Sequence, residues 1–211
     1  MSKADVTLYA ITDRGAIGQR DFYEAIEAAL KGGATILQLR EKEIDEYTLI
    51  AEAKKAKKIC AKYSVPLIIN DNYKAAIAAG ADGVHVGIED APVDEIRRLA
   101  GKDFIIGATA KTVEQAKAAQ AAGADYLGVG AVFPSPTKKN AIRITNEQLR
   151  EIVASVDIPV TAIGGISKSN MAELKGCGAD GCALVSAIFA AEDIEAECRE
   201  LKNLSQEVFA K

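Results

Sequence analysis

The sequence predicts a single α/β domain, residues 1–211, built as a (β/α)8 barrel, also called a TIM barrel. Short runs of β-branched residues alternate with longer amphipathic stretches along nearly the whole chain, which is typical of parallel strands joined by helices. About eight such units fit into 211 residues, near the lower size limit of the barrel. An open doubly wound sheet is the alternative, because the same alternation also builds that fold.

The expected strands are the apolar runs at residues 6–11, 35–39, 66–70, 83–86, 104–109, 126–129, 159–163 and 181–185. Between them, residues 47–62 and 113–122 have clear helical patterns. A short repeated motif, which we call the Gly-Ala echo, supports the number of units. Gly-Ala followed by Thr or Asp begins at residues 33, 80, 123 and 178, each time before an even-numbered strand. Glycine ends a helix readily in a left-handed conformation, so the echo indicates a repeated βα module.

Composition places the chain among compact soluble domains. Hydrophobic residues make up 49% of the chain and charged residues 27%, which is enough for a sizeable core. The net charge of -4 argues against a surface for polyanions, so no nucleic-acid partner is expected. Charged residues recur through the first thirty positions, and no apolar stretch is long enough to span a bilayer. A cytoplasmic protein without a membrane partner is therefore expected.

The cysteines and the single histidine do not have the spacing of a zinc site. Cys60, Cys177, Cys182 and Cys198 include no Cys-x-x-Cys pair, and His85 is the only histidine. Buried reduced thiols, as in cytosolic proteins, are the better interpretation. His85 lies in a run that alternates apolar residues, which favours a hydrogen-bonded strand histidine over a catalytic base.

Two polar clusters follow expected strands. Residues 38–42, Gln-Leu-Arg-Glu-Lys, end the second strand, and Asn70 and Asp71 end the third. Arg40 and Lys42 carry positive charge suited to phosphate, and Asp71 offers a hard oxygen ligand suited to Mg²⁺. Either cluster alone could be an ordinary surface ion pair. Together they favour a phosphorylated, metal-bound substrate.

In a barrel, the carboxyl ends of all strands open onto one face. Asp90 follows the fourth strand there, and Thr109 ends the fifth. The sixth strand leads into residues 128–139, whose glycines and prolines disfavour a helix and which carry two hydroxyls and two lysines. Gly164 and Gly165 follow the seventh strand, where they either make a tight turn or bind phosphate, and Ser186 in the adjoining loop favours phosphate.

Over nearly its whole length the chain resembles the thiamine phosphate synthase family. The residues that carry the resemblance are Ile11-Thr12-Asp13, Gln38 to Lys42, Ile69-Asn70-Asp71, Gly83 to Gly87 with Asp90, Pro134 to Lys138, Ile163 to Ile166 and Ser186-Ala187-Ile188. The resemblance implies a transferase that joins hydroxymethylpyrimidine diphosphate to thiazole phosphate, giving thiamine phosphate and pyrophosphate. Its partners would be these small molecules, and the resemblance also suggests a homo-oligomer.

The resemblance also implies the roles of individual residues. The pyrimidine diphosphate would be held by Gln38, Arg40, Lys42, Asn70, Thr109 and Lys138, with Leu39 and Glu41 in the same motif. The Mg²⁺ cofactor would be bound at the pyrophosphate by Asp71 and Asp90. The thiazole phosphate would be held by Ser135, Thr137, Gly165, Val185 and Ser186, with Pro136 between the two hydroxyls. Arg40, Lys42, Thr109 and Lys138 would take part in catalysis, and no enzyme nucleophile is required.

The chain departs from the family pattern at Ile88, at Lys111 and in the residues after Lys138. Two alternatives to a synthase stay open. A thiazole tautomerase shares the barrel but, by resemblance, uses a histidine after the fifth strand, where residues 107–111 contain none. A non-catalytic phosphate-binding barrel is the other, since a fold by itself proves no activity.

Overall fold

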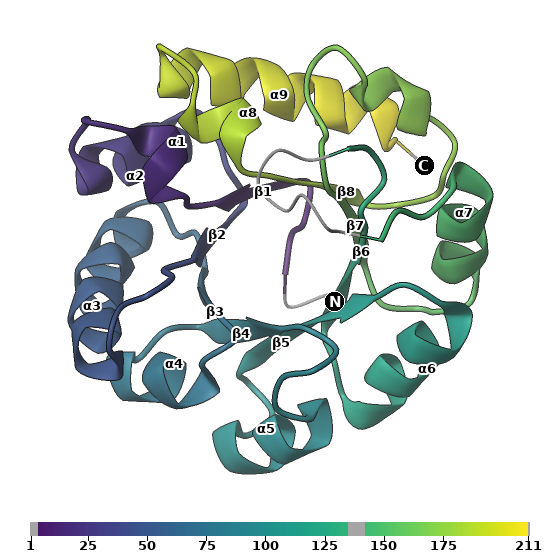
Figure 1. Ribbon diagram of the computed structural model, residues 1–211, viewed down its shortest axis with the longest axis horizontal. Helices are drawn as coiled ribbons and strands as arrows, with labels where there is room; N and C mark the ends of the chain where they lie inside the picture. Colours follow the sequence, from purple (N-terminus) through teal and green to yellow (C-terminus); the bar gives the residue numbers. More distant parts are fainter. Residues whose placement is uncertain (1–3, 135–141, 211) are drawn as a thin grey trace.

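The computed structural model describes residues 4–134 and 142–210. Its parallel strands pair in sequence order, and the last pairs with the first, so the sheet closes into a barrel (Figure 1). The described strands are β1 (Leu8–Ile11), β2 (Ile36–Leu39), β3 (Leu67–Asn70), β4 (Gly83–Val86), β5 (Ile105–Ala110), β6 (Tyr126–Gly130), β7 (Val160–Ile163) and β8 (Gly181–Leu184). The predicted (β/α)8 barrel is confirmed, and the open sheet is excluded.

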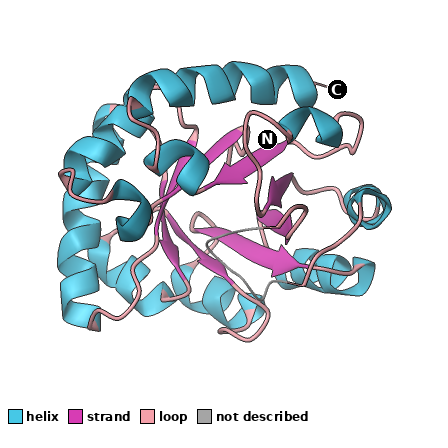
Figure 2. Cartoon of the chain, turned by 45° about the horizontal axis from the view of Figure 1, so that its top comes forward, coloured by secondary structure: helices cyan, strands magenta, loops and turns pink. Residues whose placement is uncertain are grey.

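Helices form a layer around the barrel (Figure 2). The described helices are α1 (Arg14–Ile17), α2 (Phe22–Lys31), α3 (Glu46–Lys62), α4 (Tyr73–Ala79), α5 (Val93–Ala100), α6 (Val113–Ala122), α7 (Asn146–Ala154), α8 (Ser186–Phe189) and α9 (Ile194–Val208), with a 3₁₀ helix, η1 (Met171–Leu174), before β8. No helix in the described part of the chain is long and apolar enough to cross a membrane.

Buried side chains pack both inside the barrel and between its strands and the surrounding helices. Side chains that point outward from the strands pack against the helices in one large cluster, which includes Leu37, Leu39 and Ile69. Side chains that point inward form a smaller cluster, which includes Ile36 and Ile68. This separation follows from the alternation of side chains along each strand.

The first strand begins later than its sequence pattern predicts. Residues 6–11 are apolar or β-branched, but β1 begins at Leu8. Ala4 and Val6 are instead buried against the inner cluster, so this segment helps to fill the barrel interior. Burial of an apolar side chain does not require a strand, which explains why the sequence pattern extends further than the hydrogen bonding.

The Gly-Ala echo has the predicted left-handed glycines and an additional role. Gly80 and Gly123 end α4 and α6 in the left-handed conformation, whereas Gly178 (φ +83°) follows a 3₁₀ helix instead of an α-helix. The third residue of each echo caps the strand before it. The side chains of Thr35, Asp82, Asp125 and Asp180 accept the backbone N–H of Leu8, Leu67, Ile106 and Val160 at 2.7 to 3.0 Å. The echo therefore marks a repeated strand cap at the amino end of the barrel.

Replacing Asp125 with alanine is expected to destabilise the fold by about 3 kcal/mol, because it breaks a largely buried ion pair and a strand cap. Asp125 accepts the Ile106 N–H at 2.8 Å and pairs with Arg97 at 2.6 Å. Urea unfolding measures the change. Arg150→Ala, which removes a 3.8 Å exposed pair with Glu147, is the control and should change stability by less than about 0.5 kcal/mol. Equal effects of the two variants would contradict the capping role.

Candidate active site

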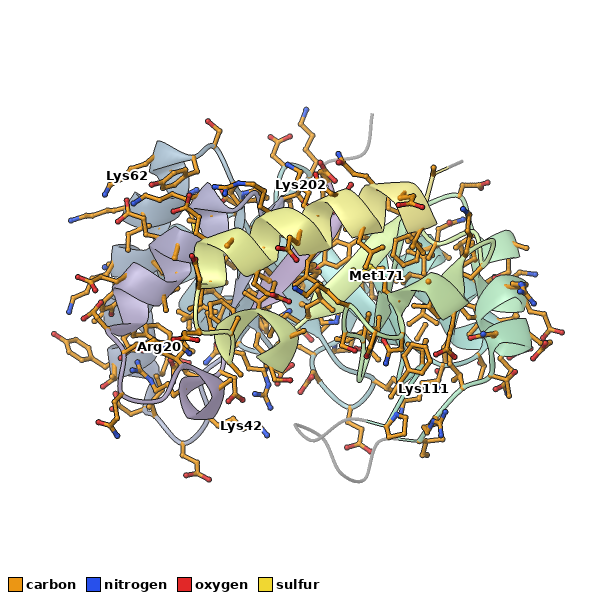
Figure 3. The ribbon with its side chains drawn as sticks, turned by 90° about the horizontal axis from the view of Figure 1, so that it is seen from above. Arg20, Lys42, Lys62, Lys111, Met171 and Lys202 are labelled. Atoms are coloured by element: carbon orange, nitrogen blue, oxygen red, sulfur yellow. The ribbon has the colours of Figure 1, made fainter. Side chains whose placement is uncertain are left out.

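The carboxyl ends of the strands define one face of the barrel. Figure 3 shows Lys42, after β2, and Lys111, after β5, along the same edge of the molecule, with Lys62 and Lys202 near the opposite edge. Lys42 is exposed at this face and accessible to a ligand from solution. Residues far apart in sequence therefore meet at this face because the strands are parallel and in order.

Arg40 is held in place at this face by the motif that follows β1. Its backbone N–H donates to the Thr12 hydroxyl at 2.9 Å, and its guanidinium donates to the Asp13 carboxylate at 3.1 Å. The other oxygen of Asp13 accepts the Ala16 N–H at the start of α1. A guanidinium fixed in this way loses less side-chain entropy when it binds an anion.

Leu39 and Glu41 alternate with Arg40 and point the other way. Leu39 is fully buried in the outer cluster. Glu41 pairs with Arg14 at 2.9 Å, and Arg14 also pairs with Glu52 of α3 at 2.7 Å. Burial and the neighbouring Glu52 raise the pKa of Glu41, and Arg14 opposes them. A substrate contact from Leu39 or Glu41 would therefore have to come from the backbone, and both contacts stay predictions.

Two carboxylates converge where β3 and β4 end. Asp71 has a left-handed backbone (φ +61°), its N–H donates to His85 O at 2.8 Å, and its Oδ2 accepts from the Asn70 amide at 2.5 Å. Asp90 turns back to accept the Gly87 N–H at 2.7 Å. Desolvation by the surrounding protein and the nearby Asp90 carboxyl group raise the pKa of Asp71 from 3.8 to about 6. Asn70 and Arg40 act in the opposite direction.

This arrangement fits a magnesium ion. A divalent cation between the two carboxylates would favour the ionised form of Asp71, which the neighbouring Asp90 opposes. No group of three or more His, Cys, Asp or Glu side chains converges among residues 4–134 and 142–210. Mg²⁺ does not require one, since it is commonly bound by one or two carboxylates together with substrate phosphates and water. Asp71 and Asp90 would hold it.

A continuous line of hydrogen bonds crosses the barrel interior beneath this face. The Gln38 amide donates to the Tyr9 hydroxyl at 2.7 Å, and the Tyr9 and Tyr126 hydroxyls are 2.7 Å apart. The Tyr126 hydroxyl is 3.1 Å from His85 Nδ1, and His85 Nε2 is 3.1 Å from the Thr109 hydroxyl. Gln38, Tyr9, Tyr126 and His85, which we call the interior chain, come from β2, β1, β6 and β4. The line reaches solvent-accessible Thr109 on β5.

Burial keeps the interior chain uncharged. Gln38 is 3% exposed and His85 9%, and both tyrosines are more deeply buried. Desolvation lowers the pKa of His85 to about 4, so its imidazole is neutral at pH 7, although Asp90 acts in the opposite direction. Desolvation also raises the pKa of Tyr9 and Tyr126. The prediction that His85 is a hydrogen-bonded strand histidine is confirmed.

Gly164 and Gly165 allow two loops to approach closely. Both have positive φ, +100° and +66°. A Cβ on Gly164 would lie 2.6 Å from Ala131 Cβ, and a Cβ on Gly165 would lie 2.2 Å from Pro134 O. The two glycines therefore make a tight turn, and phosphate binding there stays a prediction. The turn lies at the strand-end face beside Pro134, a position compatible with phosphate binding.

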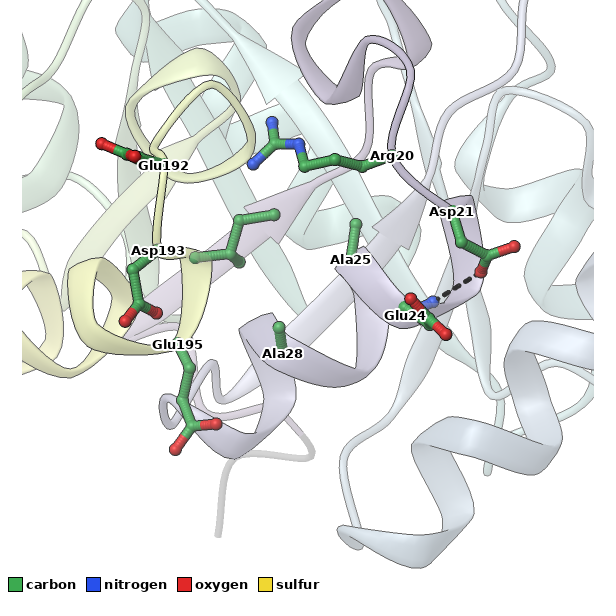
Figure 4. Close-up of a pocket in the computed structure, with 9 residues that line it drawn as sticks. Arg20, Asp21, Glu24, Ala25, Ala28, Glu192, Asp193 and Glu195 are labelled. Carbon is green, nitrogen blue, oxygen red and sulfur yellow. Dashed lines mark hydrogen bonds between the residues drawn. The ribbon is translucent and has the colours of Figure 1, made fainter.

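Val185 and Ser186 lie where β8 passes into α8. Ser186 begins this short helix, and both residues are partly accessible. Arg20 holds the other end of α8, because its guanidinium donates to the carbonyl oxygens of Ala191 and Phe189. Arg20 lines a hollow of about 440 Å³ beside α2 and the start of α9. Figure 4 shows it there with the acidic residues Glu192 and Asp193. The hollow is separate from the predicted site, and Arg20 acts there as an anchor for α8.

Comparison with known proteins identifies the family of this barrel. The model of the thiamine monophosphate synthase family matches residues 8–188. The chain belongs to this family. The thiamine-phosphate synthase of Clostridium tetani is 44% identical over 203 residues, which cover 96% of this chain and 97% of the relative. The thiamine-phosphate synthase of Methanobrevibacter smithii is 47% identical over 193 residues, 92% of each chain.

A solved structure agrees with the assignment to the thiamine monophosphate synthase family. The thiamine phosphate pyrophosphorylase from Pyrococcus furiosus has a TM-score of 0.89 and 38% identity, covering 99% of both chains. A geranylgeranylglyceryl phosphate synthase from Thermoplasma acidophilum, at 18% identity and a TM-score of 0.69, shares the fold alone. The resemblance inferred from the motifs, and the transferase class that it implied, are confirmed.

Several expectations for this member of the thiamine monophosphate synthase family have different outcomes. The four cysteines are free and buried, as predicted. Ser135, Pro136, Thr137 and Lys138 lie outside the described residues. Tyr9 and Tyr126 were not predicted to take part in the site, although each is an aromatic residue with a polar tip in an inward-facing strand position. Asp13 belongs to a matched motif, but only the structure shows that its carboxylate accepts a hydrogen bond from the Arg40 guanidinium.

Proposed function

We propose that this chain joins hydroxymethylpyrimidine diphosphate to thiazole phosphate with the help of Mg²⁺, giving thiamine phosphate and pyrophosphate. The convergence of Asp71 and Asp90 beside Arg40 at the strand ends carries this proposal. A metal-binding carboxylate pair next to a fixed guanidinium is suited to a diphosphate. The names of the curated relatives, thiamine-phosphate synthases, give the reaction to which this chemistry corresponds.

The charge that develops in the reaction explains these residues. When the C–O bond to the diphosphate breaks, several negative charges collect on the leaving pyrophosphate. Mg²⁺, when bound, would act as a Lewis acid that stabilises these negative charges. Arg40, already oriented by Thr12 and Asp13, would donate to the same oxygens without having to reorganise. Lys42, exposed at the same face, would add a second positive charge.

The chain's own nucleophiles are not needed in this reaction. The electron-rich aminopyrimidine carries the transient positive charge, and the thiazole nitrogen forms the new bond to carbon. Desolvation raises the pKa of Cys60, Cys182 and Cys198 to about 12, so these buried thiols are neutral. Thr109 and Asn70 are proposed as hydrogen-bonding groups, and Gln38, from the interior chain, would bind the pyrimidine substrate.

The thiazole phosphate is assigned to the other side of the face. Gly165, Val185 and Ser186 would bind it, together with Ser135 and Thr137 of the segment after Pro134. The accessible residues at the β8 and α8 junction and the glycine turn after β7 support this assignment, because barrel enzymes frequently bind phosphate after these two strands. The assignment of individual contacts rests on the resemblance.

Incubating the protein with both phosphorylated precursors and Mg²⁺, and then detecting thiamine phosphate by mass, tests the proposal. Product should form with Mg²⁺ and stop on chelation. Isomerisation of a thiazole carboxylate without coupling would favour the tautomerase, for which residues 107–111 lack a histidine. Binding of phosphate with neither reaction would favour a non-catalytic barrel. The free buried thiols support the cytoplasm as the compartment, and sedimentation would test the suggested homo-oligomer.

Lys138 and its neighbour Lys139 provide a matched pair of variants. By resemblance Lys138 reaches the pyrophosphate, so Lys138→Ala is expected to lower kcat by about one to two orders of magnitude, with a smaller effect on thiazole phosphate affinity. Ser135→Ala should show the opposite balance, and Lys139→Ala should be nearly silent. Steady-state kinetics with each substrate varied measures all three. Equal losses at Lys138 and Lys139 would mean that the role assigned to Lys138 is wrong.

A further inference from the structure

Each hydrogen bond of the interior chain runs from a donor to an acceptor, so the chain as a whole has a direction. A phenol has one hydrogen to donate, and a neutral imidazole has one nitrogen that donates and one that accepts. Tyr9 has two neighbours in the line, the Gln38 amide and the Tyr126 hydroxyl. The Gln38 nitrogen can only donate. With the amide nitrogen toward Tyr9, the Tyr9 hydrogen points to Tyr126.

The same reasoning continues to the end of the line. Because Tyr126 receives a hydrogen from Tyr9, it donates its own to His85 Nδ1, 3.1 Å away. Nδ1 then carries no hydrogen, and the buried, neutral imidazole carries it on Nε2. Nε2 donates to the Thr109 hydroxyl at 3.1 Å. The oxygen of Thr109 is thereby occupied as an acceptor, and its hydrogen is left to donate elsewhere.

The opposite direction would leave a different group at the face. If the Gln38 amide were turned over, its oxygen would accept from Tyr9, and every bond of the line would reverse. His85 would then carry its hydrogen on Nδ1, and the Thr109 hydroxyl would donate inward to Nε2. A Thr109 that donates inward offers only lone pairs to a substrate, and lone pairs repel an oxygen on which negative charge is growing.

We propose that the interior chain fixes the tautomer of His85 and thereby holds the Thr109 hydroxyl as a hydrogen-bond donor toward the substrate. Tyr9, Tyr126 and His85 are positioning residues in this scheme, since they act through Thr109. Each hydrogen bond in a buried line polarises the next, which strengthens the donor at its end. The inference rests on the proposed function in one respect, because it takes Thr109 as a substrate contact.

The tautomer can be measured without any activity. His85 is the only histidine of the chain, so untagged, ¹⁵N-labelled protein has a single imidazole in a long-range ¹H–¹⁵N correlation spectrum. The expected result at pH 7 is a protonated Nε2 and an unprotonated Nδ1. A protonated Nδ1, or protons on both nitrogens, would overturn the proposed direction. This measurement is independent of whether the protein is a synthase.

Tyr126→Phe breaks the line and keeps the ring. It should produce a population of His85 with the hydrogen on Nδ1, and it should lower kcat by about tenfold, the equivalent of one neutral hydrogen bond in the transition state. Tyr63→Phe, which removes a hydroxyl that donates to Glu27 at 3.0 Å outside the barrel, is the matched control. Its histidine spectrum and its kcat should match those of the wild type.

A double-mutant cycle shows whether the line acts through Thr109. In a Thr109→Val background the effect of Tyr126→Phe on kcat should disappear, because the hydroxyl that the line orients is absent. Thr109→Ser should restore the sensitivity to Tyr126→Phe. Additive losses would overturn the positioning role. If the wild type does not form thiamine phosphate, the proposed function fails, whereas the spectrum still decides the direction of the line.

Discussion

Replacing Asp71 with asparagine is expected to lower kcat by about 100-fold or more, because an amide is a much weaker ligand than a carboxylate for the ion that stabilises the leaving pyrophosphate. The concentration of Mg²⁺ needed for half-maximal activity should rise, and excess Mg²⁺ should restore part of the rate. Initial rates across a Mg²⁺ titration measure both effects. Asp103→Asn, at an exposed position before β5, is the control and should leave both unchanged.

The stability of the same variant separates a lost ligand from a damaged fold. The pKa of Asp71 is raised from 3.8 to about 6 in the metal-free fold, so the folded state binds this proton more tightly than the unfolded chain does. Its ionisation lowers stability as the pH rises from about 4 to 6, and the loss persists at higher pH. Asp71→Asn removes that loss, so without metal at pH 7.5 the variant should be at least as stable as the wild type. A clear drop in its Tm would assign Asp71 to the fold.

Arg40→Ala is expected to reduce kcat/KM for the pyrimidine diphosphate by about 100- to 1,000-fold, since it removes a prepositioned positive charge from the leaving group. Arg40→Lys should recover only part of the loss, because an ammonium group cannot form the paired hydrogen bonds of a guanidinium. Asp13→Asn should have a smaller effect in the same direction, because it weakens the contact at 3.1 Å that orients Arg40.

The matched control for Arg40 is Arg98→Ala on α5, an exposed arginine whose loss should leave kcat/KM close to that of the wild type. Steady-state kinetics at fixed ionic strength measures the three arginine variants. The result that would contradict the role of Arg40 is a loss confined to the KM of thiazole phosphate, since that pattern would place its charge beside the other substrate.

The sequence could predict features that depend on local pattern. Buried parallel strands favour short apolar runs, and glycines such as Gly80 and Gly123 favour helix ends, so the barrel and the bounds of its strands, α3 and α6 were predictable to within about two residues. The polar residues after β2 and β3 were predictable as neighbours at one face, because parallel strands bring their carboxyl ends together. The motif order led to the family that the comparisons confirm.

Other features depend on which side chains meet across the barrel, and only the tertiary structure decided them. The sequence pattern makes Tyr9 and Tyr126 apolar strand residues, and nothing local indicates that their hydroxyls lie 2.7 Å apart, 117 residues from each other along the chain. The polar cluster at residues 38–42 was visible in the sequence, but the pairing of Glu41 with Arg14 was not. Strand formation is governed by neighbours in sequence, whereas hydrogen-bond partners in a closed barrel are determined by its register and curvature.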